Sequence, residues 1–263
     1  MYNYAIIENK SIKKTAIIND ENKIISRWFD NIYPLGIILC SSFYYIAESV
    51  NKEAIFSIDD KTYPLSGWYK RVYIDGLVAG LSNYYIVKNN NKKAIFHKDD
   101  KTYPLSGWHD DIDAYGLVNN ESNYYTACNN GKDAIFHKIN KEKPITKYWE
   151  TIYYNGLIND KSDYYIVQND KDQEAIFHKD NKDKPVSEWY DEISSCGLIV
   201  NESDYYIACN NNKEAIFHKD NKGKPVSEWY DKIDLKSLSD NDFKSFNIKY
   251  NNKFDWVNNI LVE

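Results

Sequence analysis

The chain has 263 residues, of which 43% are hydrophobic and 16% aromatic, and its formal net charge is −6. This apolar fraction is enough for a continuous core, but no run approaches the roughly 18 apolar residues that a membrane-spanning helix needs. Acidic and basic residues are mixed throughout, whereas ordinary nucleic-acid binding needs a basic stripe that displaces counterions. We therefore expect no direct nucleic-acid contact and no membrane.

Three residue series recur with a period near 40, which is typical of a repeat architecture. Tyr-Tyr pairs begin at 44, 84, 124, 164 and 205, and an Ala-Ile pair recurs at 16, 54, 94, 134, 175 and 215. The third series is tryptophan, which we expect to form the shared core between copies: Trp28, Trp68, Trp108, Trp149, Trp189 and Trp229. The sequence predicts one six-repeat β domain over 1–235, with copies at about 2–35, 42–75, 82–115, 122–155, 162–196 and 203–235.

The third copy shows the elements that we expect in each repeat. Residues 84–87 and 93–97 are apolar strands, and the Asn-rich 89–92 between them predicts a turn, because Asn tolerates positive φ. Residues 104–112 predict a third strand opened by a proline, and 116–118 a short fourth strand or bridging segment. This meander of short strands predicts an all-β fold.

The repeat pattern stops near residue 235. Apolar residues then follow at steps of three and four, which predicts a helical stripe: Phe243, Phe246, Tyr250, Phe254, Val257 and Leu261. We expect 236–263 to be a C-terminal helical cap over the last repeat, with a partial seventh β unit as the alternative.

Copies of this length suit either an open stack or a six-bladed β-propeller. The first copy begins at the same strand as the others, so no strand is exchanged between the chain ends to close a ring. We therefore prefer an open β-solenoid or superhelix to the propeller.

Residues 212–231 resemble the bacterial WG or KWG β-repeat. They read Asn-Lys-Glu-Ala-Ile-Phe-His-Lys-Asp-Asn-Lys-Gly-Lys-Pro-Val-Ser-Glu-Trp-Tyr-Asp. That family runs roughly Gly-Lys-Trp-Gly-Tyr-Ile-Asp, a Gly-Lys turn, a strand that ends in Pro, and Tyr-Asp. The rhythm agrees over 2–233, although Ala215 stands where the Gly would be and Trp has moved to the third strand. The resemblance implies a β-repeat protein used for binding or interaction.

Two sets of residues, the histidines and the cysteines, are candidates for a metal or redox site. His97, His137, His178 and His218 share one repeat position. Equivalent residues of successive multi-strand repeats lie about 10 Å or more apart, too far to converge on one ion, so we expect face-lining side chains bonded to a turn carbonyl and no metal. The cysteines lack CxxC spacing, and we expect buried, reduced thiols: Cys40, Cys128, Cys196 and Cys209.

Positions that differ between copies are the best candidates for recognition. Tyr69-Lys70-Arg71 in the second copy becomes His109-Asp110-Asp111 in the third, so a shared face would carry a local basic spot. Tyr63 and Tyr103 lie beside turns, where we expect exposed aromatic rings. The predicted partner-binding residues are Tyr63, Tyr69, Lys70, Arg71, Tyr103, His109, Asp110 and Asp111.

No catalytic motif emerges from the sequence. We find no P-loop, GxSxG, HExxH or Cys/His nucleophile arrangement. Glu188 and Glu228 recur in near-identical copies, so nothing distinguishes an acid from a base. We expect no enzyme activity and no cofactor.

The sequence therefore favours a non-enzymatic binding protein with a protein partner. The N-terminus lacks a basic region followed by an apolar segment, so we expect no signal peptide and a cytoplasmic chain. A sharper hypothesis is a phage or mobile-element inhibitor that blocks a host defence nuclease, so that the partner would be a nucleic-acid-binding enzyme. The alternatives are a carbohydrate or cell-wall-binding repeat protein and a propeller hydrolase.

Overall fold

The computed structural model describes residues 4–39, 41–60, 62–140 and 143–234, and the backbone of 246–250 and 253–257. The chain divides into two compact units. The first is Met1–Asn129 with Lys138–Glu142, and the second is Asn130–His137 with Lys143–Glu263.

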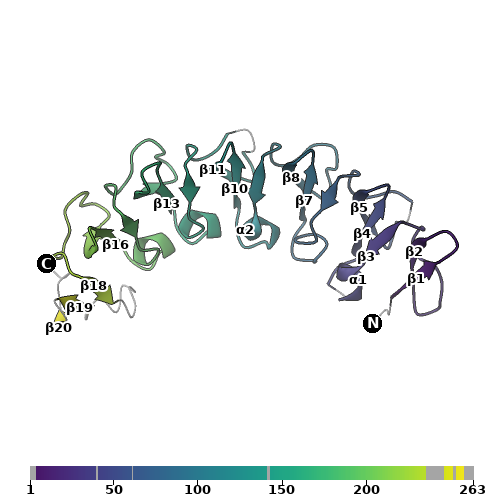
Figure 1. Cartoon of the computed structure of the whole chain (residues 1–263), viewed down its shortest axis with the longest axis horizontal. Helices are drawn as coiled ribbons and strands as arrows, with labels where there is room; N and C mark the ends of the chain where they lie inside the picture. Colours follow the sequence, from purple (N-terminus) through teal and green to yellow (C-terminus); the bar gives the residue numbers. More distant parts are fainter. Residues whose placement is uncertain are drawn as a thin grey trace. The chain divides into compact units, whose positions relative to one another are not determined.

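The first unit consists of short antiparallel strands with two helical turns (Figure 1). Its elements are β1 (Ala5–Asn9), β2 (Lys14–Ile18), β3 (Asn31–Tyr33), α1 (Leu35–Ile38), β4 (Tyr44–Ser49), β5 (Lys52–Ser57), β6 (Arg71–Val72), β7 (Tyr84–Asn89), β8 (Lys92–His97), β9 (Asp111–Asp113), α2 (Tyr115–Val118) and β10 (Tyr124–Asn129). Strands β3-β4-β5 and β6-β7-β8 form three-stranded sheets, β1 pairs with β2, and β9 pairs with β10.

The second unit repeats this organisation, with 3-10 turns in place of the α-helical ones (Figure 1). Its elements are β11 (Lys132–His137), β12 (Thr151–Ile152), η1 (Gly156–Asn159), β13 (Tyr164–Gln168), β14 (Glu174–His178), β15 (Glu192–Ile193), η2 (Gly197–Val200), β16 (Tyr205–Asn210), β17 (Lys213–His218), β18 (Lys232–Asp234), β19 (Phe246–Tyr250) and β20 (Lys253–Val257). Its three-stranded sheets are β12-β13-β14, β15-β16-β17 and β18-β19-β20. The chain is therefore all-β, as the sequence predicts.

The predicted central hairpin is confirmed. Strands β7 and β8 pair in register from Tyr84↔His97 to Asn89↔Lys92. Asn90 and Asn91 between them have φ values of +47° and +62°, the left-handed conformation that asparagine tolerates.

The predicted third strand over 104–112 is wrong as a continuous strand. His109 forms a single bridge with Lys93 in its own sheet, whereas β9 pairs with β10 of the next sheet. The chain thus leaves one sheet and enters the next within two residues. We call the stretch from Ser106 to Asp113, and its equivalents in the other copies, the crossing segment.

Two further expectations are corrected. Residues 116–118, predicted as a fourth strand or bridge, belong to the helical turn α2, in which Leu117 and Val118 are buried. In the predicted helical cap, 236–263, the described residues are the strands β19 and β20; β19 pairs with β18 on one side and with β20 on the other. The sequence also carries the strand period of two, with Phe246, Ile248 and Tyr250 in β19 and Phe254 and Trp256 in β20, and Asn251-Asn252 interrupts the helical spacing between them. The other cap residues lie outside the described part of the chain.

A buried hydroxyl connects each crossing segment to its own sheet. Ser106 Oγ accepts a hydrogen bond from Ile95 N–H at 2.9 Å and donates one to Gly107 O at 2.8 Å. The side chain therefore replaces a backbone acceptor where the chain bends away from the strand. The same two bonds, between 2.7 and 3.0 Å, recur at Ser26, Ser66, Thr146, Ser187 and Ser227.

Tyrosine and phenylalanine, not tryptophan, occupy the centre of the core. The second tyrosine of each Tyr-Tyr pair is fully buried, at Tyr45, Tyr85, Tyr125, Tyr165 and Tyr206. In four copies it stacks on the phenylalanine of the neighbouring strand at centroid distances of 5.3–5.8 Å. The tryptophans that the sequence predicts as the core therefore lie at the rim of the core: Trp108 is 37% exposed, and the other five indoles are half-buried.

We expect Ser106→Ala to lower the free energy of unfolding by about 1–3 kcal/mol, because it leaves the Ile95 N–H buried without an acceptor. Ser106→Thr retains the hydroxyl that Thr146 supplies in the fourth copy, so it should lose less. Urea unfolding of both variants measures the difference; equal losses would show that packing, not the hydroxyl, matters at this position.

Candidate functional site

A groove lies beside β6, the strand that opens the β6-β7-β8 sheet of the first unit. Its volume is about 530 Å³, and we call it the basic groove. It is lined by Tyr33, Ile46, Glu53, Lys70, Arg71, Val72, Tyr73, Ile74 and Lys88. The structure thus brings together two of the predicted partner-binding residues, Lys70 and Arg71.

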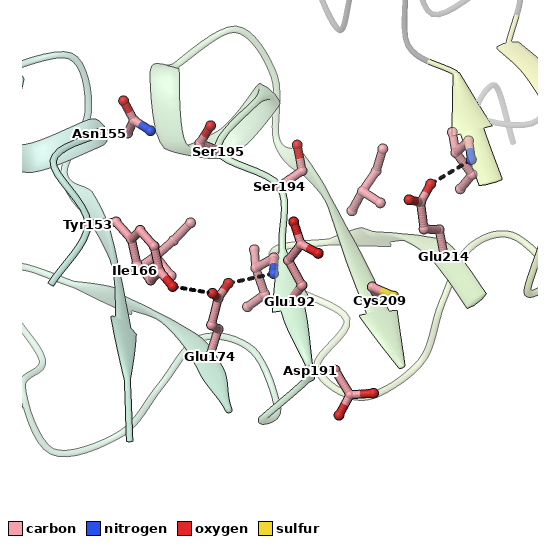
Figure 2. Close-up of a pocket in the computed structure, with 13 residues that line it drawn as sticks. Tyr153, Asn155, Ile166, Glu174, Asp191, Glu192, Ser194, Ser195, Cys209 and Glu214 are labelled. Atoms are coloured by element: carbon pink, nitrogen blue, oxygen red, sulfur yellow. Dashed lines mark hydrogen bonds between the residues drawn. The ribbon is translucent and has the colours of Figure 1, made fainter. Parts of the chain in front are cut away.

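The second unit has a groove at the corresponding repeat position, which we call the acidic groove (Figure 2). Its volume is about 600 Å³. It is lined by Tyr153, Asn155, Ile166, Glu174, Asp191, Glu192, Ile193, Ser194, Ser195, Ile207, Cys209, Glu214 and Ile233. The single bridges Glu53↔Tyr69 and Glu174↔Tyr190 fix the register between the copies. Asp191 and Glu192 therefore stand where Lys70 and Arg71 stand in the basic groove.

A glutamate of one sheet holds the opening strand of the next sheet in both grooves. Glu53 Oε2 accepts a hydrogen bond from Val72 N–H at 2.6 Å, and Glu174 Oε2 accepts one from Ile193 N–H at 2.7 Å. Figure 2 shows the second bond beside another, in which the Tyr153 hydroxyl donates to Glu174 Oε1 at 2.5 Å. These carboxylates are framework groups as well as groove walls.

One other copy satisfies the same N–H in this way, and two satisfy it differently. In the last described sheet Glu214 Oε2 accepts from Ile233 N–H at 2.6 Å. In two copies the acceptor is instead the side chain of the preceding residue: Asn31 Oδ1 for Ile32 N–H at 2.9 Å and Asp111 Oδ1 for Ile112 N–H at 2.7 Å.

Burial governs protonation in both grooves. It raises the pKa of Glu53, although the hydrogen bond from Val72 opposes it. Burial and the contact with Glu174 raise the pKa of Tyr153, so the phenol remains a donor. Burial and the surrounding carboxylates also raise the pKa of Cys209, which keeps this thiol protonated. The acidic groove therefore offers hydrogen-bonding and charged groups, and its cysteine is a weak nucleophile.

The two grooves differ most in charge. The basic groove has three cations, Lys70, Arg71 and Lys88, against one carboxylate. The acidic groove has four carboxylates and neither Lys nor Arg among its lining residues. Equivalent positions of one repeat thus carry opposite charges.

Lys70 breaks an ion pair that recurs in other copies. A carboxylate at this position pairs with the lysine that opens the last strand of its sheet: Asp30–Lys14 at 2.8 Å, Asp110–Lys92 at 3.1 Å and Glu150–Lys132 at 2.7 Å. In the second copy the strand lysine is present as Lys52, but Lys70 replaces the carboxylate. Two cations therefore occupy the paired positions, which repel each other.

The same substitution removes an acceptor from the next hairpin. Asp30 Oδ2 accepts from Val50 N–H at 2.7 Å, and Asp191 Oδ2 from Asn211 N–H at 2.7 Å. A lysine cannot accept these bonds, so Lys70 forgoes an ion pair and a turn contact.

Tyr69 has a packing position. Its half-buried ring lies 5.5 Å from Phe96 and 6.2 Å from Trp108, between successive sheets, and burial raises its pKa. Its equivalents Phe29 and Tyr190 make similar contacts. The bridge Asp133↔Trp149 shows that Trp149 takes this position in the fourth copy, one residue beyond the other indoles.

The remaining predicted residues do not line the basic groove. Tyr63 and Tyr103 are 69% and 67% exposed, as expected for aromatics beside turns. Asp110 and Asp111 are exposed and form ion pairs with lysines of β8. His109 is buried, with Nδ1 2.8 Å from Asn129 Nδ2.

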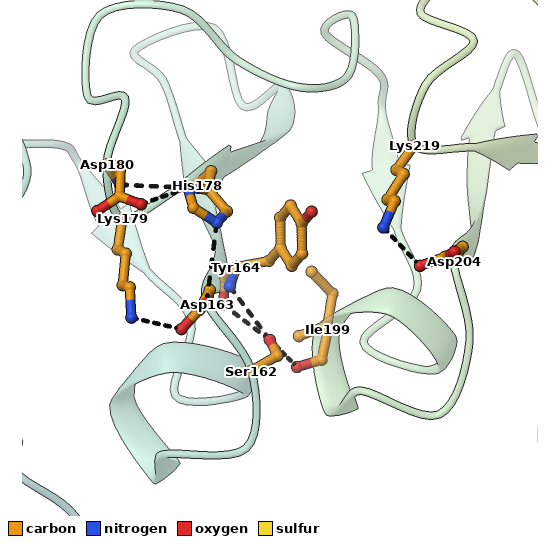
Figure 3. A network of polar contacts seen from close by, with 9 residues as sticks. All are labelled: Ser162, Asp163, Tyr164, His178, Lys179, Asp180, Ile199, Asp204 and Lys219. Atoms are coloured by element: carbon orange, nitrogen blue, oxygen red, sulfur yellow. Dashed lines mark hydrogen bonds and ion pairs between the residues drawn. The ribbon is translucent and has the colours of Figure 1, made fainter.

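Three of the repeated histidines, His97, His178 and His218, contact their own turns, but Nδ1 accepts a backbone N–H there, whereas the sequence predicts a bond to a turn carbonyl. Figure 3 shows His178 Nδ1 beside Asp180, whose N–H lies 3.3 Å away, and Asp163 in an ion pair with Lys179 at 2.7 Å. His97 and His218 accept N–H groups in the same way. Among the described residues, no group of three or more His, Cys, Asp or Glu could hold a metal ion.

None of the described helices is long and apolar enough to cross a membrane.

A serine hydroxyl also links neighbouring sheets within each unit. Ser162 Oγ donates to Ile199 O at 2.6 Å in the second unit (Figure 3). Ser42 Oγ donates to Val78 O at 2.7 Å in the first.

Sequence reasoning missed the structural role of Glu53 and Glu174. The available signal was the recurrence of Glu before Ala-Ile-Phe in the second, fifth and sixth copies. That signal has meaning only when the opening strand of a sheet is known to come from the preceding copy.

We expect Lys70→Asp to raise the free energy of unfolding by about 0.2–1 kcal/mol, the usual range for an exposed ion pair, because the new carboxylate can pair with Lys52. Urea unfolding of this variant and of Lys70→Ala checks it. If the two variants are equally stable, the repeated ion pair has no value at this position.

His109 should make stability depend on pH. Burial lowers its pKa below the ordinary value of about 6.5, with Lys92 lowering it further and Asn129 and Asp110 opposing. The unfolded chain then binds the proton more tightly, so stability is full above about pH 6.5 and falls as the pH drops through the folded-state pKa. His109→Tyr, which supplies the residue of the equivalent position 69, should remove this part of the pH dependence. Thermal unfolding between pH 7.5 and about pH 5 measures it, and identical slopes would contradict the assignment.

Comparisons with known proteins do not place the chain in a family. No family model matches the sequence, and no curated protein matches it. Solved structures with some likeness include one described as a eukaryotic initiation factor (10% identity, TM-score 0.38, 98% of this chain and 73% of that one). Others are the C-terminal WD40 domain of Sif2 (8%, 0.32, 97% and 77%) and Hsv2 of Kluyvelomyces marxianus (11%, 0.31, 95% and 88%). At TM-scores below 0.5 the likeness does not identify a shared fold.

Proposed function

We propose that the chain is a non-enzymatic protein-binding protein whose specificity lies in the grooves between successive sheets. The observation that carries this proposal is the opposite charge of the two grooves at equivalent repeat positions. Glu53 and Glu174 accept the same backbone N–H of the next sheet, so the difference in charge resides in the outward side chains. Repeat proteins set their specificity at such outward positions, while the shared framework keeps the stack intact.

The lining of the grooves also suits a protein partner. Ile46 and Val72 are buried beneath the basic groove, and Ile74 is 41% exposed at its side. Apolar surface beside charged groups is typical of protein interfaces, where a desolvated centre is surrounded by a polar rim.

A second candidate is the inhibitor that blocks a nucleic-acid-binding enzyme, such as a host defence nuclease. The acidic groove favours it, because Asp191, Glu192 and Glu214 offer a negative surface to a basic nucleic-acid groove. In both versions we propose a cytoplasmic chain of WG-type repeats in an open stack, with the closed propeller as the alternative arrangement.

We expect the purified chain to capture a protein from a low-GC bacterial lysate at physiological salt. At least one groove variant, K70D/R71E or D191K/E192R, should reduce capture tenfold or more, as quantified by mass spectrometry. Matched controls with the same change of net charge in the same unit are K23D/K101E and E202R/E228K.

Capture that is indifferent to both groove variants would refute the groove proposal. For the inhibitor version, D191K/E192R should be the damaging variant, and capture should weaken with added salt because charge attraction is screened. Capture that survives high salt would count against that version.

A further inference from the structure

The basic groove holds three cations against one carboxylate, Glu53, whose pKa is raised by burial and lowered by the charge of Arg71. Arg71 and Lys88 are direct register partners on β6 and β7, and like charges opposite each other destabilise a sheet. None of Lys70, Arg71 and Lys88 takes part in a salt bridge within the described chain. The chain as a whole is acidic, with a net charge of −6. Cations concentrated in one groove of an acidic protein point to an anionic ligand.

The repeat shows that this charge replaces a stabilising arrangement. Three other copies place a carboxylate at the position of Lys70 and pair it with a strand lysine. The second copy keeps Lys52 and gives up the pair. A position that departs from its own repeat at a cost in stability is typical of a functional site.

An aromatic ring orients one of these cations, Arg71. The Arg71 guanidinium lies 5.7 Å from the Tyr73 ring centroid, and Lys93 Nζ lies 5.2 Å from it. Lys93 is itself held in an ion pair with Asp111. The Tyr73 ring therefore has a fixed neighbour, and its contact with Arg71 orients the guanidinium.

We propose that the basic groove binds an acidic peptide segment of a partner protein, with carboxylates on Lys70, Arg71 and Lys88. An apolar side chain of the same segment packs on Ile74 and Tyr33, which are 41% and 37% exposed. The planar guanidinium of Arg71 matches a carboxylate bidentately. This inference rests on the proposed protein-binding function and names the chemistry of one partner segment.

A peptide fits the groove better than a nucleic acid does. The three cations line one groove of about 530 Å³ together with the carboxylate of Glu53 and the buried Ile46, so apolar and acidic groups border them. A nucleic-acid site instead needs a basic stripe that follows a phosphate backbone. The acidic segment supplies both charges and an apolar contact within a few residues.

The test uses the whole chain and three fluorescein-labelled probes, measured by fluorescence anisotropy. The probes are the peptide Glu-Asp-Leu-Glu-Phe-Asp-Glu, its counterpart Lys-Lys-Leu-Lys-Phe-Lys-Lys, and a twelve-residue oligothymidylate. We expect the acidic peptide to bind at least tenfold more tightly than either other probe. K70D/R71E should weaken its binding tenfold or more, whereas K23D/K101E should leave it within twofold. Ile74→Asp should also weaken it.

Two outcomes would overturn the inference. Oligothymidylate that binds as tightly as the acidic peptide would show a general polyanion site, and acidic-peptide binding that survives K70D/R71E would place the contact elsewhere. Circular dichroism and unfolding of each variant separate lost binding from lost folding, because Lys70→Asp is expected to fold at least as stably as the parent.

The same variants distinguish this inference from the proposed function. If D191K/E192R abolishes capture of a lysate protein while K70D/R71E leaves it intact, the binding function stands and the acidic-peptide site falls. If neither variant changes capture but the acidic peptide binds in the basic groove, capture of the lysate protein does not depend on the grooves, whereas the acidic-peptide site stands.

Discussion

The crossing segment is the constraint on which the other features of this fold depend. A chain that leaves one sheet and enters the next within two residues must bend without leaving buried donors unsatisfied. The hydroxyl of Ser106 and its equivalents meets that need by accepting an N–H of the strand it leaves. The aromatic ring that follows three residues later, such as Tyr69 after Ser66, then packs on the phenylalanine and tryptophan of the next sheet. Each sheet is therefore completed by the preceding copy, which supplies its opening strand and an aromatic ring that packs on it.

Much of the fold could be predicted from the sequence, because its strongest signals are local. The hairpin of β7 and β8 combines apolar strands with an Asn-Asn turn, and both requirements are visible in a single copy. The crossing segment was not predictable as a bend, since Pro-Leu-Ser-Gly-Trp reads as a strand by composition. The Ser106 hydroxyl competes with backbone carbonyls as the acceptor of the Ile95 N–H, and tertiary contacts determine which of them accepts it.

The candidate site could be predicted only in part, for a related reason. Lys70 and Arg71 stand out when the copies are aligned, because charge changes sign there. The wall formed by Glu53 and Lys88 could not be assigned to the same groove, since sheets combine strands from successive copies. The meaning of Lys70 likewise required the partner position, Lys52, which lies on a different strand.

A fixed requirement for one acceptor connects the framework to the charge of the grooves. The N–H of the apolar residue in each opening strand must be satisfied, but either the preceding side chain or a glutamate of the previous sheet can do so. Where the preceding side chain accepts, the strand position holds Thr15 or Lys93 in place of glutamate. Where a glutamate accepts this N–H, the residue before the apolar one does not have to be an acceptor. It is Arg71, Glu192 or Lys232. Arg71 and Glu192, which help to charge the two grooves, are thus free to differ because Glu53 and Glu174 accept the N–H in their place.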